Sequence, residues 1–263
     1  MDLAGGKLRL DHPADHVARL TIDNPDKRNA LDHEILDGFA ATLPGLEARC
    51  LLITATGPVF SAGYDIGNLP REEFADRAEA LVAHPFHAAI EALDAFPYPS
   101  VAALNGHAIG GGLELALSCD LRVASEEAKL GMPPARLGLV YSHTGLRKFV
   151  DAIGVPRTKE LFFTARNITA RTALQWGLIN EVCAPEELAD RGVAYAARIA
   201  ANAPLSLQGN KRTLRELLAA EGALDPEVER ELVELREACF HSEDFFEGVR
   251  AFAEKRQPRW QGR

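Results

Sequence analysis

The stretch Asn105-Gly106-His107-Ala108-Ile109-Gly110-Gly111-Gly112-Leu113-Glu114-Leu115-Ala116-Leu117-Ser118-Cys119-Asp120 decides the fold of this chain. The apolar residues 101–104 come just before it and predict a buried strand, while residues 113–119 predict a short buried helix. Strand, glycine loop and helix is therefore the expected order. The three successive glycines remove every Cβ where the loop meets the helix, so backbone N–H groups can approach a ligand there.

A glycine loop of this kind is a candidate oxyanion hole. The first N–H groups of a helix have no intrahelical acceptor and lie at the positive end of the helix dipole. They therefore favour an oxygen atom that carries or acquires negative charge. The alternative is that the glycines only allow the strand and the helix to pack closely.

The length and composition predict one large core with an extension, and they argue against several partners. A chain of 263 residues can bury a sizeable core. Acidic residues outnumber Lys and Arg by 38 to 29 without any dense basic run, which argues against nucleic acid. The four cysteines are far apart and form no Cys-x-x-Cys pair, which indicates free thiols rather than a zinc site. Without a signal peptide or a long uncharged apolar run, we expect a cytoplasmic protein that does not enter membranes.

The rest of the chain predicts an α/β core followed by an all-helical end. Asp32 is a suitable N-cap for a helix over residues 33–42. From Pro185 onward the pattern is almost wholly helical. We therefore expect a core that contains the active site over residues 1–184 and a helical oligomerisation region over residues 185–263. Apolar or alternating runs predict strands at 17–22, 50–54, 120–124 and 179–182.

Four groups of residues match, in order and spacing, the motifs of a known family. They are Asn24-Pro25 with Asn29-Ala30-Leu31, Phe60-Ser61-Ala62-Gly63-Tyr64-Asp65, Asn105-Gly106 through Gly110-Gly111-Gly112 to Asp120, and Ile168-Thr169-Ala170 to Gly177-Leu178-Ile179. On these motifs the sequence resembles the crotonase family, also called the enoyl-CoA hydratase/isomerase superfamily, over nearly its whole length. The resemblance implies a spiral of ββα turns, followed by helices that pack subunits into trimers or dimers of trimers.

The resemblance also implies an acyl-CoA substrate that reacts through a thioester enolate. In the family, two backbone N–H groups bind the thioester oxygen, and here they belong to Tyr64 and Gly111, with Ala62 and Gly110 beside the substrate. Two fixed donors stabilise the enolate charge without reorganising, and the loss of one typically costs about 3 to 4 kcal/mol of barrier. No metal or redox cofactor is implied, because coenzyme A enters as part of the substrate.

This chain has only one of the two glutamates that the family's hydratases need. Those enzymes use two glutamates, one to take a proton from water and one to deliver a proton to the α-carbon. Glu114 matches the first, whereas Pro134 stands where the second belongs. No other carboxylate lies between Glu127 and Asp151, so ordinary hydration is not favoured.

A closer resemblance within the family is to the crotonase-type methylmalonyl-CoA decarboxylases. They share the Met-x-Pro and Leu-Gly before the loop, a tyrosine at the position of Tyr141, and an ending like residues 242–258. In those enzymes the tyrosine hydroxyl helps to hold the carboxylate that is lost, although Tyr141 could instead be a packing aromatic. They carry histidine where this chain has Tyr64. The oxyanion hole should survive that change, because the contact is made by the backbone.

Glu114 has to be protonated, turned away or paired if the reaction is a decarboxylation. An ionised glutamate about 4 Å from a substrate carboxylate would repel it by about 4 kcal/mol at an effective dielectric constant of about 20. The resembled decarboxylases keep a glutamate here, so its presence does not exclude the reaction. Equally, Glu114 could be the single acid/base group of an isomerase, which moves one proton between two carbons.

Three more residues are candidate substrate contacts. Arg28 and Lys255 fall where the family places basic groups near the CoA phosphates and adenine, in the case of Lys255 sometimes across a subunit interface. Either could instead be a solvated surface charge. His143 lies in the same loop as Tyr141 and could steer a proton, or it could cap a helix or face solvent.

Decarboxylation of a malonyl-type, methylmalonyl-like CoA ester is therefore the favoured function. The alternatives are an enoyl-CoA hydratase or isomerase that uses Glu114, and a scaffold or RNA-binding protein that keeps the fold without the chemistry. The acidic balance argues against RNA, and the intact glycine loop argues against lost chemistry. Apolar stripes after residue 185 predict a homotrimer or homohexamer, unless they cover the protein's own core. These stripes contain Leu214, Leu217, Leu218, Val228, Leu232 and Leu235.

Overall fold

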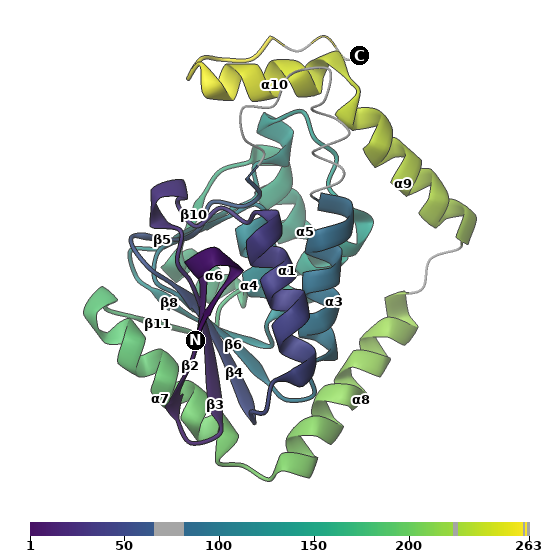
Figure 1. Cartoon of the computed structure of the whole chain (residues 1–263). Helices are drawn as coiled ribbons and strands as arrows, with labels where there is room; N and C mark the ends of the chain where they lie inside the picture. The colour runs from purple at the N-terminus through teal and green to yellow at the C-terminus, as the bar shows by residue number, and fades with distance from the viewer. Residues whose placement is uncertain (66–81, 223–225, 260, 262–263) are drawn as a thin grey trace.

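A computed structural model describes residues 1–65, 82–222, 226–259 and 261, and over these residues it has the predicted α/β architecture (Figure 1). The larger sheet has the strand order β1-β2-β3-β4-β6-β8-β11. Its first three strands pair antiparallel, and each pair from β3 to β11 is parallel. The strands are β1 (Asp2–Leu3), β2 (Leu8–Ala14), β3 (Val17–Ile22), β4 (Cys50–Ala55), β6 (Ser100–Leu104), β8 (Leu121–Ser125) and β11 (Glu181–Cys183).

A smaller sheet, with the strand order β10-β9-β7-β5, positions the candidate site. Its strands are β5 (Val59–Ser61), β7 (His107–Ile109), β9 (Lys129–Gly131) and β10 (Ile168–Thr169). β5 and β7 pair in parallel, so their carboxyl ends lie at the same edge of the sheet. β5 ends just before Ala62-Gly63-Tyr64, and β7 ends just before the three glycines. The small sheet therefore brings together two motifs that are far apart in the sequence.

Helices cover both faces of the larger sheet, because its side chains alternate between the two faces. Leu20 and Ile53 belong to the main core, with α1 and α3 on their side. Val17 and Leu52 belong to a second core cluster under α7. The helices are α1 (His33–Thr42), α3 (His87–Ala95), α4 (Gly111–Ser118), α5 (His143–Thr164), α6 (Ala170–Trp176), α7 (Leu188–Ala200), α8 (Pro204–Gly222), α9 (Pro226–Phe240) and α10 (Glu243–Ala253). Shorter helical turns are η1 (Ala4–Gly6), η2 (Pro25–Lys27), η3 (Leu43–Gly45), η4 (Val82–Phe86), η5 (Pro134–Arg136) and η6 (Pro185–Glu187).

Local sequence signals set most of these boundaries. The Asp32 carboxylate accepts the N–H of Ile35 at 3.0 Å, which confirms the predicted cap of α1. The last strand begins later than the predicted residue 179. Gly177, with φ +81°, ends α6, and the N–H groups of Leu178 and Ile179 both bond back to the carbonyl of Ala173. These two residues therefore close the helix instead of starting β11.

The region after residue 185 contains two different kinds of helix. α7 packs against the larger sheet, where Leu188 and Ala196 are buried. Figure 1 shows α8 and α9 running along the outside of the molecule, with α10 returning over one end of it. Several side chains of the predicted stripes are exposed here, whereas those of residues 232 and 235 lie outside what the structure describes. The exposed ones are Leu214, Leu217, Leu218 and Val228. The division at residue 184 and the oligomerising role stay predictions.

None of the helices in the described part of the chain is long and apolar enough to span a membrane.

Candidate active site

The glycine loop joins β7 to α4 through a backbone conformation that favours glycine. Gly110 has φ +56° and ψ −127° and is the N-cap of α4. Its carbonyl accepts the N–H groups of Leu113 and Glu114 at 3.0 and 3.1 Å, and its own N–H donates to the carbonyl of Gly131 at 2.9 Å. Gly111 is therefore the first residue of the helix, and helix geometry gives its N–H no acceptor within α4. This N–H lies at the positive end of the helix dipole.

Close packing also requires glycine in this loop. A Cβ on Gly112 would lie 2.6 Å from the Cβ of Ser61. A Cβ on Gly111 would lie 2.8 Å from both Cε1 and Cζ of the Tyr64 ring. Real Cβ atoms essentially never approach other heavy atoms this closely. The packing role that the sequence allowed is therefore real, and it holds the loop against the segment that contains Tyr64.

The backbone of Tyr64 is aligned by a short parallel bridge to Leu31. The Leu31 N–H donates to the carbonyl of Gly63 at 2.7 Å, and the Asp65 N–H donates to the carbonyl of Leu31 at 3.0 Å. Successive N–H groups of an extended chain point to opposite sides, so the Tyr64 N–H points away from Leu31. On Gly63, a Cβ would lie 3.3 Å from the nitrogen of Gly111. The two peptide segments that an oxyanion hole needs thus lie side by side.

The side chain of Asn29 supports these peptide segments through hydrogen bonds to the backbone. Asn29 is fully buried with φ +54°, and its Nδ2 donates to the carbonyls of Thr56 and Val59 at 2.7 Å each. Its Oδ1 accepts the N–H of Asn24 at 2.8 Å. Asn29 belonged to a recognised motif, but the sequence did not reveal this role. One amide side chain that bonds three backbone groups explains why the motif needs asparagine.

Glu114 lies inside the protein rather than at a water-filled surface. Only 5% of it is exposed, and its Oε2 accepts a hydrogen bond from the hydroxyl of Tyr141. Burial raises the pKa of the Glu114 carboxyl above its ordinary value. Hydrogen bonds from Tyr141 and Tyr64 and the charge of Lys148 oppose that shift in part. The carboxyl is thus both paired and biased toward its neutral form, as a nearby substrate carboxylate would require.

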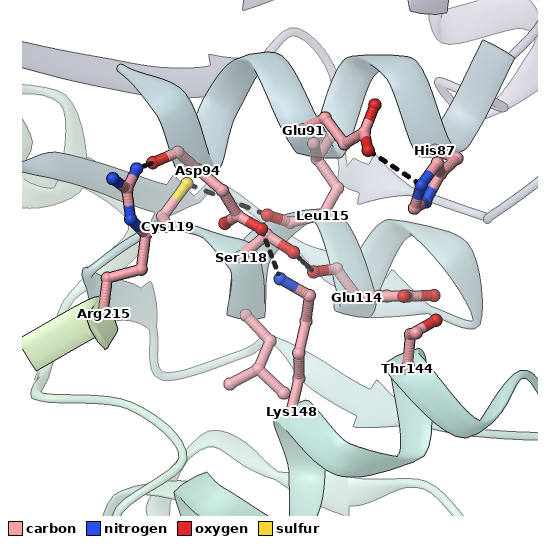
Figure 2. Close-up of polar contacts among 12 residues, drawn as sticks. His87, Glu91, Asp94, Glu114, Leu115, Ser118, Cys119, Thr144, Lys148 and Arg215 are labelled. Carbon is pink, nitrogen blue, oxygen red and sulfur yellow. Dashed lines mark hydrogen bonds and ion pairs between the residues drawn. The ribbon is translucent and has the colours of Figure 1, made fainter. Parts of the chain in front are cut away.

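A charged pair flanks this carboxyl. Figure 2 shows Lys148 of α5 reaching Asp94 of α3 beside α4, with its Nζ 3.0 Å from Oδ2 of Asp94. Lys148 acts to lower the pKa of Glu114 and Asp94 acts to raise it. Because Lys148 is engaged by Asp94, its charge only partly offsets the cost of burying Glu114. Burial therefore decides the direction of the shift.

Tyr141 belongs to the same hydrogen-bonded group as Glu114. Its ring stands edge-on to Phe162 with centroids 5.5 Å apart, and a Cβ on Gly145 would lie 2.6 Å from its Cε1. Burial and the neighbouring Glu114 raise the pKa of Tyr141 well above its ordinary value, so the phenol keeps its proton. The sequence suggested a hydroxyl directed at a substrate carboxylate. In the structure this hydroxyl is directed at Glu114.

The side chain of Tyr64 is the feature of the site that sequence reasoning missed. The sequence assigned a role only to its backbone N–H, yet its side chain lies close enough to Glu114 and Tyr141 to act on the pKa of both, lowering that of Glu114 and raising that of Tyr141. Its ring lies against Gly111 and meets Phe86 edge-on at a centroid distance of 4.9 Å. The available signal was that the resembled decarboxylases have histidine at this position. The structure thus brings together all four predicted catalytic residues, which are Tyr64, Gly111, Glu114 and Tyr141.

Pro134 is buried in the turn η5, at the start of the loop that leads to Tyr141. It carries no titratable group that could act as a second acid. The loop is covered by α10: a Cβ on Gly138 would lie 2.7 Å from the carbonyl oxygen of Asp244, and one on Gly248 would lie 2.5 Å from the carbonyl of Leu137. The C-terminal helix therefore holds the segment that carries Tyr141 in place.

The remaining candidates lie around this centre. His143 begins α5, and its Nε2 lies 3.2 Å from Oε1 of Glu229 in α9, so it pairs with the C-terminal helices. Ala62 is exposed and donates its N–H to the carbonyl of Arg28 at 3.0 Å, which places Arg28 beside the oxyanion segment. Lys255 is exposed in the turn after α10. Contacts of Arg28 and Lys255 with coenzyme A stay predictions.

Comparison with known proteins identifies the family. Residues 13–263 match the family described as Enoyl-CoA hydratase/isomerase. The chain is 35% identical to "Methylmalonyl-CoA decarboxylase" of Escherichia coli (strain K12) over 251 residues, 94% of this chain and 95% of that protein. It is also 35% identical to "Probable enoyl-CoA hydratase" of Bacillus subtilis (strain 168) over 260 residues, again 94% and 95%. A crystal structure of methylmalonyl-CoA decarboxylase complexed with 2S-carboxypropyl-CoA superposes with a TM-score of 0.89, 32% identity and 98% coverage of both chains.

The chain is therefore a member of the crotonase, or enoyl-CoA hydratase/isomerase, family, and the fold and family predicted from its motifs are confirmed. Its relatives carry the names of hydratases as well as of a decarboxylase. Membership thus defines an acyl-CoA enzyme class, and the particular reaction has to be argued from the site.

Proposed function

We propose that this crotonase-family enzyme decarboxylates a malonyl-type CoA ester, of the size of a methylmalonyl ester, through a thioester enolate. The observation that carries the proposal is the buried contact between Glu114 and Tyr141, with Pro134 in place of a second glutamate. The reaction breaks the bond between the α-carbon and the carboxylate, and the electron pair stays on the enolate as carbon dioxide leaves. Coenzyme A is part of the substrate, and the step requires no metal or redox cofactor.

The oxyanion hole would carry the enolate charge. The Gly111 N–H lies at the start of α4, and the Tyr64 N–H lies on the adjoining segment and points away from Leu31. Both are fixed by the backbone contacts of Gly110 and Asn29, so they need not reorganise as charge develops. Ala62 and Gly110 flank these donors and would line the substrate.

The protonation state of Glu114 would decide whether the Tyr141 hydroxyl donates to Glu114 or to the substrate carboxylate. A hydroxyl donates one proton, so Tyr141 cannot donate to Glu114 and to a substrate carboxylate at once. When Glu114 is protonated, its own proton can bond to the Tyr141 oxygen, and the Tyr141 proton then turns to the substrate. The raised pKa of Glu114 favours this arrangement and removes the repulsion between two carboxylates.

A hydratase would need the opposite chemistry from the same residues. Glu114 would have to be ionised in order to take a proton from water, and a second acid would have to reach the α-carbon. Pro134 cannot act as that acid. An isomerase that uses Glu114 alone, or a crotonase-fold protein that binds acyl-CoA without turnover, are the remaining outcomes of the test.

The test is to incubate the purified protein separately with malonyl-CoA, methylmalonyl-CoA and crotonyl-CoA. We expect release of carbon dioxide and formation of the saturated acyl-CoA from a malonyl-type ester, and slow or no hydration of crotonyl-CoA. Hydration or isomerisation that depends on Glu114, without release of carbon dioxide from either malonyl-type ester, would establish the alternative function. Binding without any turnover would establish a non-catalytic protein.

The same proposal includes a trimer or hexamer assembled through the C-terminal helices. Leu214, Leu217 and Leu218 of α8 are each about half exposed or more, at 60%, 58% and 49%. Exposed leucines on one helix are typical of a surface that a partner covers. Light scattering at micromolar concentration should give at least three times the mass of one chain, and a monomeric mass would contradict the assembly.

A further inference from the structure

We propose that the Tyr64 hydroxyl delivers the proton that completes the reaction at the substrate α-carbon, so that the new C–H bond forms on one face of the enolate. This inference rests on the proposed decarboxylation and extends it to the step that follows the loss of carbon dioxide. Loss of carbon dioxide leaves a carbanion equivalent that must acquire a proton before the product can dissociate as a saturated ester. Nothing in the first step supplies that proton.

The position of the Tyr64 ring brings it next to the reacting atoms. The ring atoms Cε1 and Cζ lie 2.8 Å from the position that a Cβ on Gly111 would take. The Gly111 N–H is a proposed donor to the enolate oxygen, and the α-carbon lies two bonds from that oxygen. Contact with Phe86, edge-on at 4.9 Å between centroids, fixes the ring in this place. A phenol held against the oxyanion hole is thus within reach of the carbon that needs the proton.

The neighbours of Tyr64 can replace the proton it gives. Glu114 accepts a hydrogen bond from Tyr141, and the Tyr64 side chain lies close enough to act on the pKa of both groups, so the three side chains form one cluster. They come from three separate elements, namely the segment after β5, α4 and the loop before α5. Glu114 is the carboxyl of this cluster, and burial raises its pKa and so favours the protonated form that can give up a proton.

The proton balance closes without any further reactant. The enolate carbon takes the phenolic proton of Tyr64, and the O–H bond breaks as the C–H bond forms. The Tyr64 oxygen takes the proton of Glu114, and the Glu114 carboxylate regains a proton from solvent after the product leaves. Before the loss of carbon dioxide, Glu114 donates this proton in a hydrogen bond to the Tyr141 oxygen. Afterwards the same proton is available to Tyr64.

The test uses the full-length protein and the variant Tyr64→Phe, which keeps the ring against Gly111 and Phe86 and removes only the hydroxyl. Methylmalonyl-CoA is decarboxylated in D2O and stopped early, before the α-hydrogen of the remaining substrate exchanges. The configuration of the 2-deuteriopropionyl product is then determined. Tyr195→Phe is the matched control, because Tyr195 belongs to α7 and packs against the second core cluster, away from the candidate site. Circular dichroism and thermal unfolding verify that both variants fold.

We expect the wild type and Tyr195→Phe to give predominantly one enantiomer. Tyr64→Phe should give a nearly racemic product, whatever its rate of carbon dioxide release, because solvent then protonates the enolate from either face. An unchanged enantiomeric excess in Tyr64→Phe, or a racemic product from the wild type, would overturn the inference and leave the decarboxylase proposal intact. A wild type that releases no carbon dioxide would instead refute the proposed function itself.

Discussion

The site has two halves that differ in what builds them. The half that we propose binds the thioester oxygen is made of backbone: the segment of Ala62 to Tyr64, the loop that begins at Gly110, and the Asn29 amide that supports them. The half that we propose faces the acyl group is made of side chains, namely Tyr64, Glu114 and Tyr141. The backbone half is set by steric constraints that few other sequences satisfy. In the side-chain half, we expect a single substitution to change the chemistry without disturbing the fold.

This difference explains why the family is easy to assign and the reaction is not. The proposed oxyanion hole would serve any reaction that passes through a thioester enolate, and relatives of equal identity to this chain carry the names of different enzymes. In the proposed function, the protonation of Glu114 and the lack of an acid at Pro134 select among those reactions.

Deleting the backbone donor should have the largest effect. We expect Gly111→Pro to lower turnover at least about a hundredfold, because it removes one oxyanion donor while proline is tolerated at the first position of a helix. Steady-state kinetics on the malonyl-type substrate measure the loss. Gly111→Ala is the matched control, because its Cβ also presses on the Tyr64 ring but its N–H remains. Equal activity of the two variants would show that the N–H is not used.

Removing the Tyr141 hydroxyl should have the next largest effect, and it should spare the backbone half. A hydrogen bond to a charged group contributes about 1.5 to 3 kcal/mol, so Tyr141→Phe should slow decarboxylation by roughly 10- to 150-fold. Glu114→Gln should slow it less, because a neutral amide can still bond to Tyr141. Kinetics of carbon dioxide release give the ranking. The reverse ranking, on an enoyl-CoA substrate, is what a hydratase or isomerase would show.

Removing the Asn29 amide should lower the stability of the backbone half without touching the proposed N–H donors. Asn29→Ala leaves the carbonyls of Thr56 and Val59 without their buried donor and should lower the free energy of unfolding by about 1 to 3 kcal/mol. Denaturant unfolding measures this loss, and turnover should fall with it as the segment before Tyr64 loosens. A variant as stable as the wild type would mean that Asn29 does not support the site.

The two halves also differ in how far the sequence predicted them. Glycine loops, caps such as Asp32 and the order of strands follow from local residue patterns, and the motifs identified Tyr64, Gly111, Glu114 and Tyr141 before their positions were known. The contact of Tyr141 with Glu114 was not predicted, because it joins α4 to the loop before α5 across 27 residues. The approach of the Tyr64 side chain to this pair was missed for the same reason: local patterns contain no information about which side chains meet inside the protein.

The pH dependence of carbon dioxide release tests the central claim, that Glu114 acts in its neutral form, most directly. Burial raises the pKa of Glu114, so the neutral form persists above the ordinary range of a glutamate and is lost as the pH rises through that raised pKa. We therefore expect kcat for a malonyl-type ester to be full on the acidic side and to fall as the pH rises. In Glu114→Gln this fall should be absent. A rate that instead increases as Glu114 ionises, and that disappears in Glu114→Gln, would contradict the account and assign Glu114 the role of a general base.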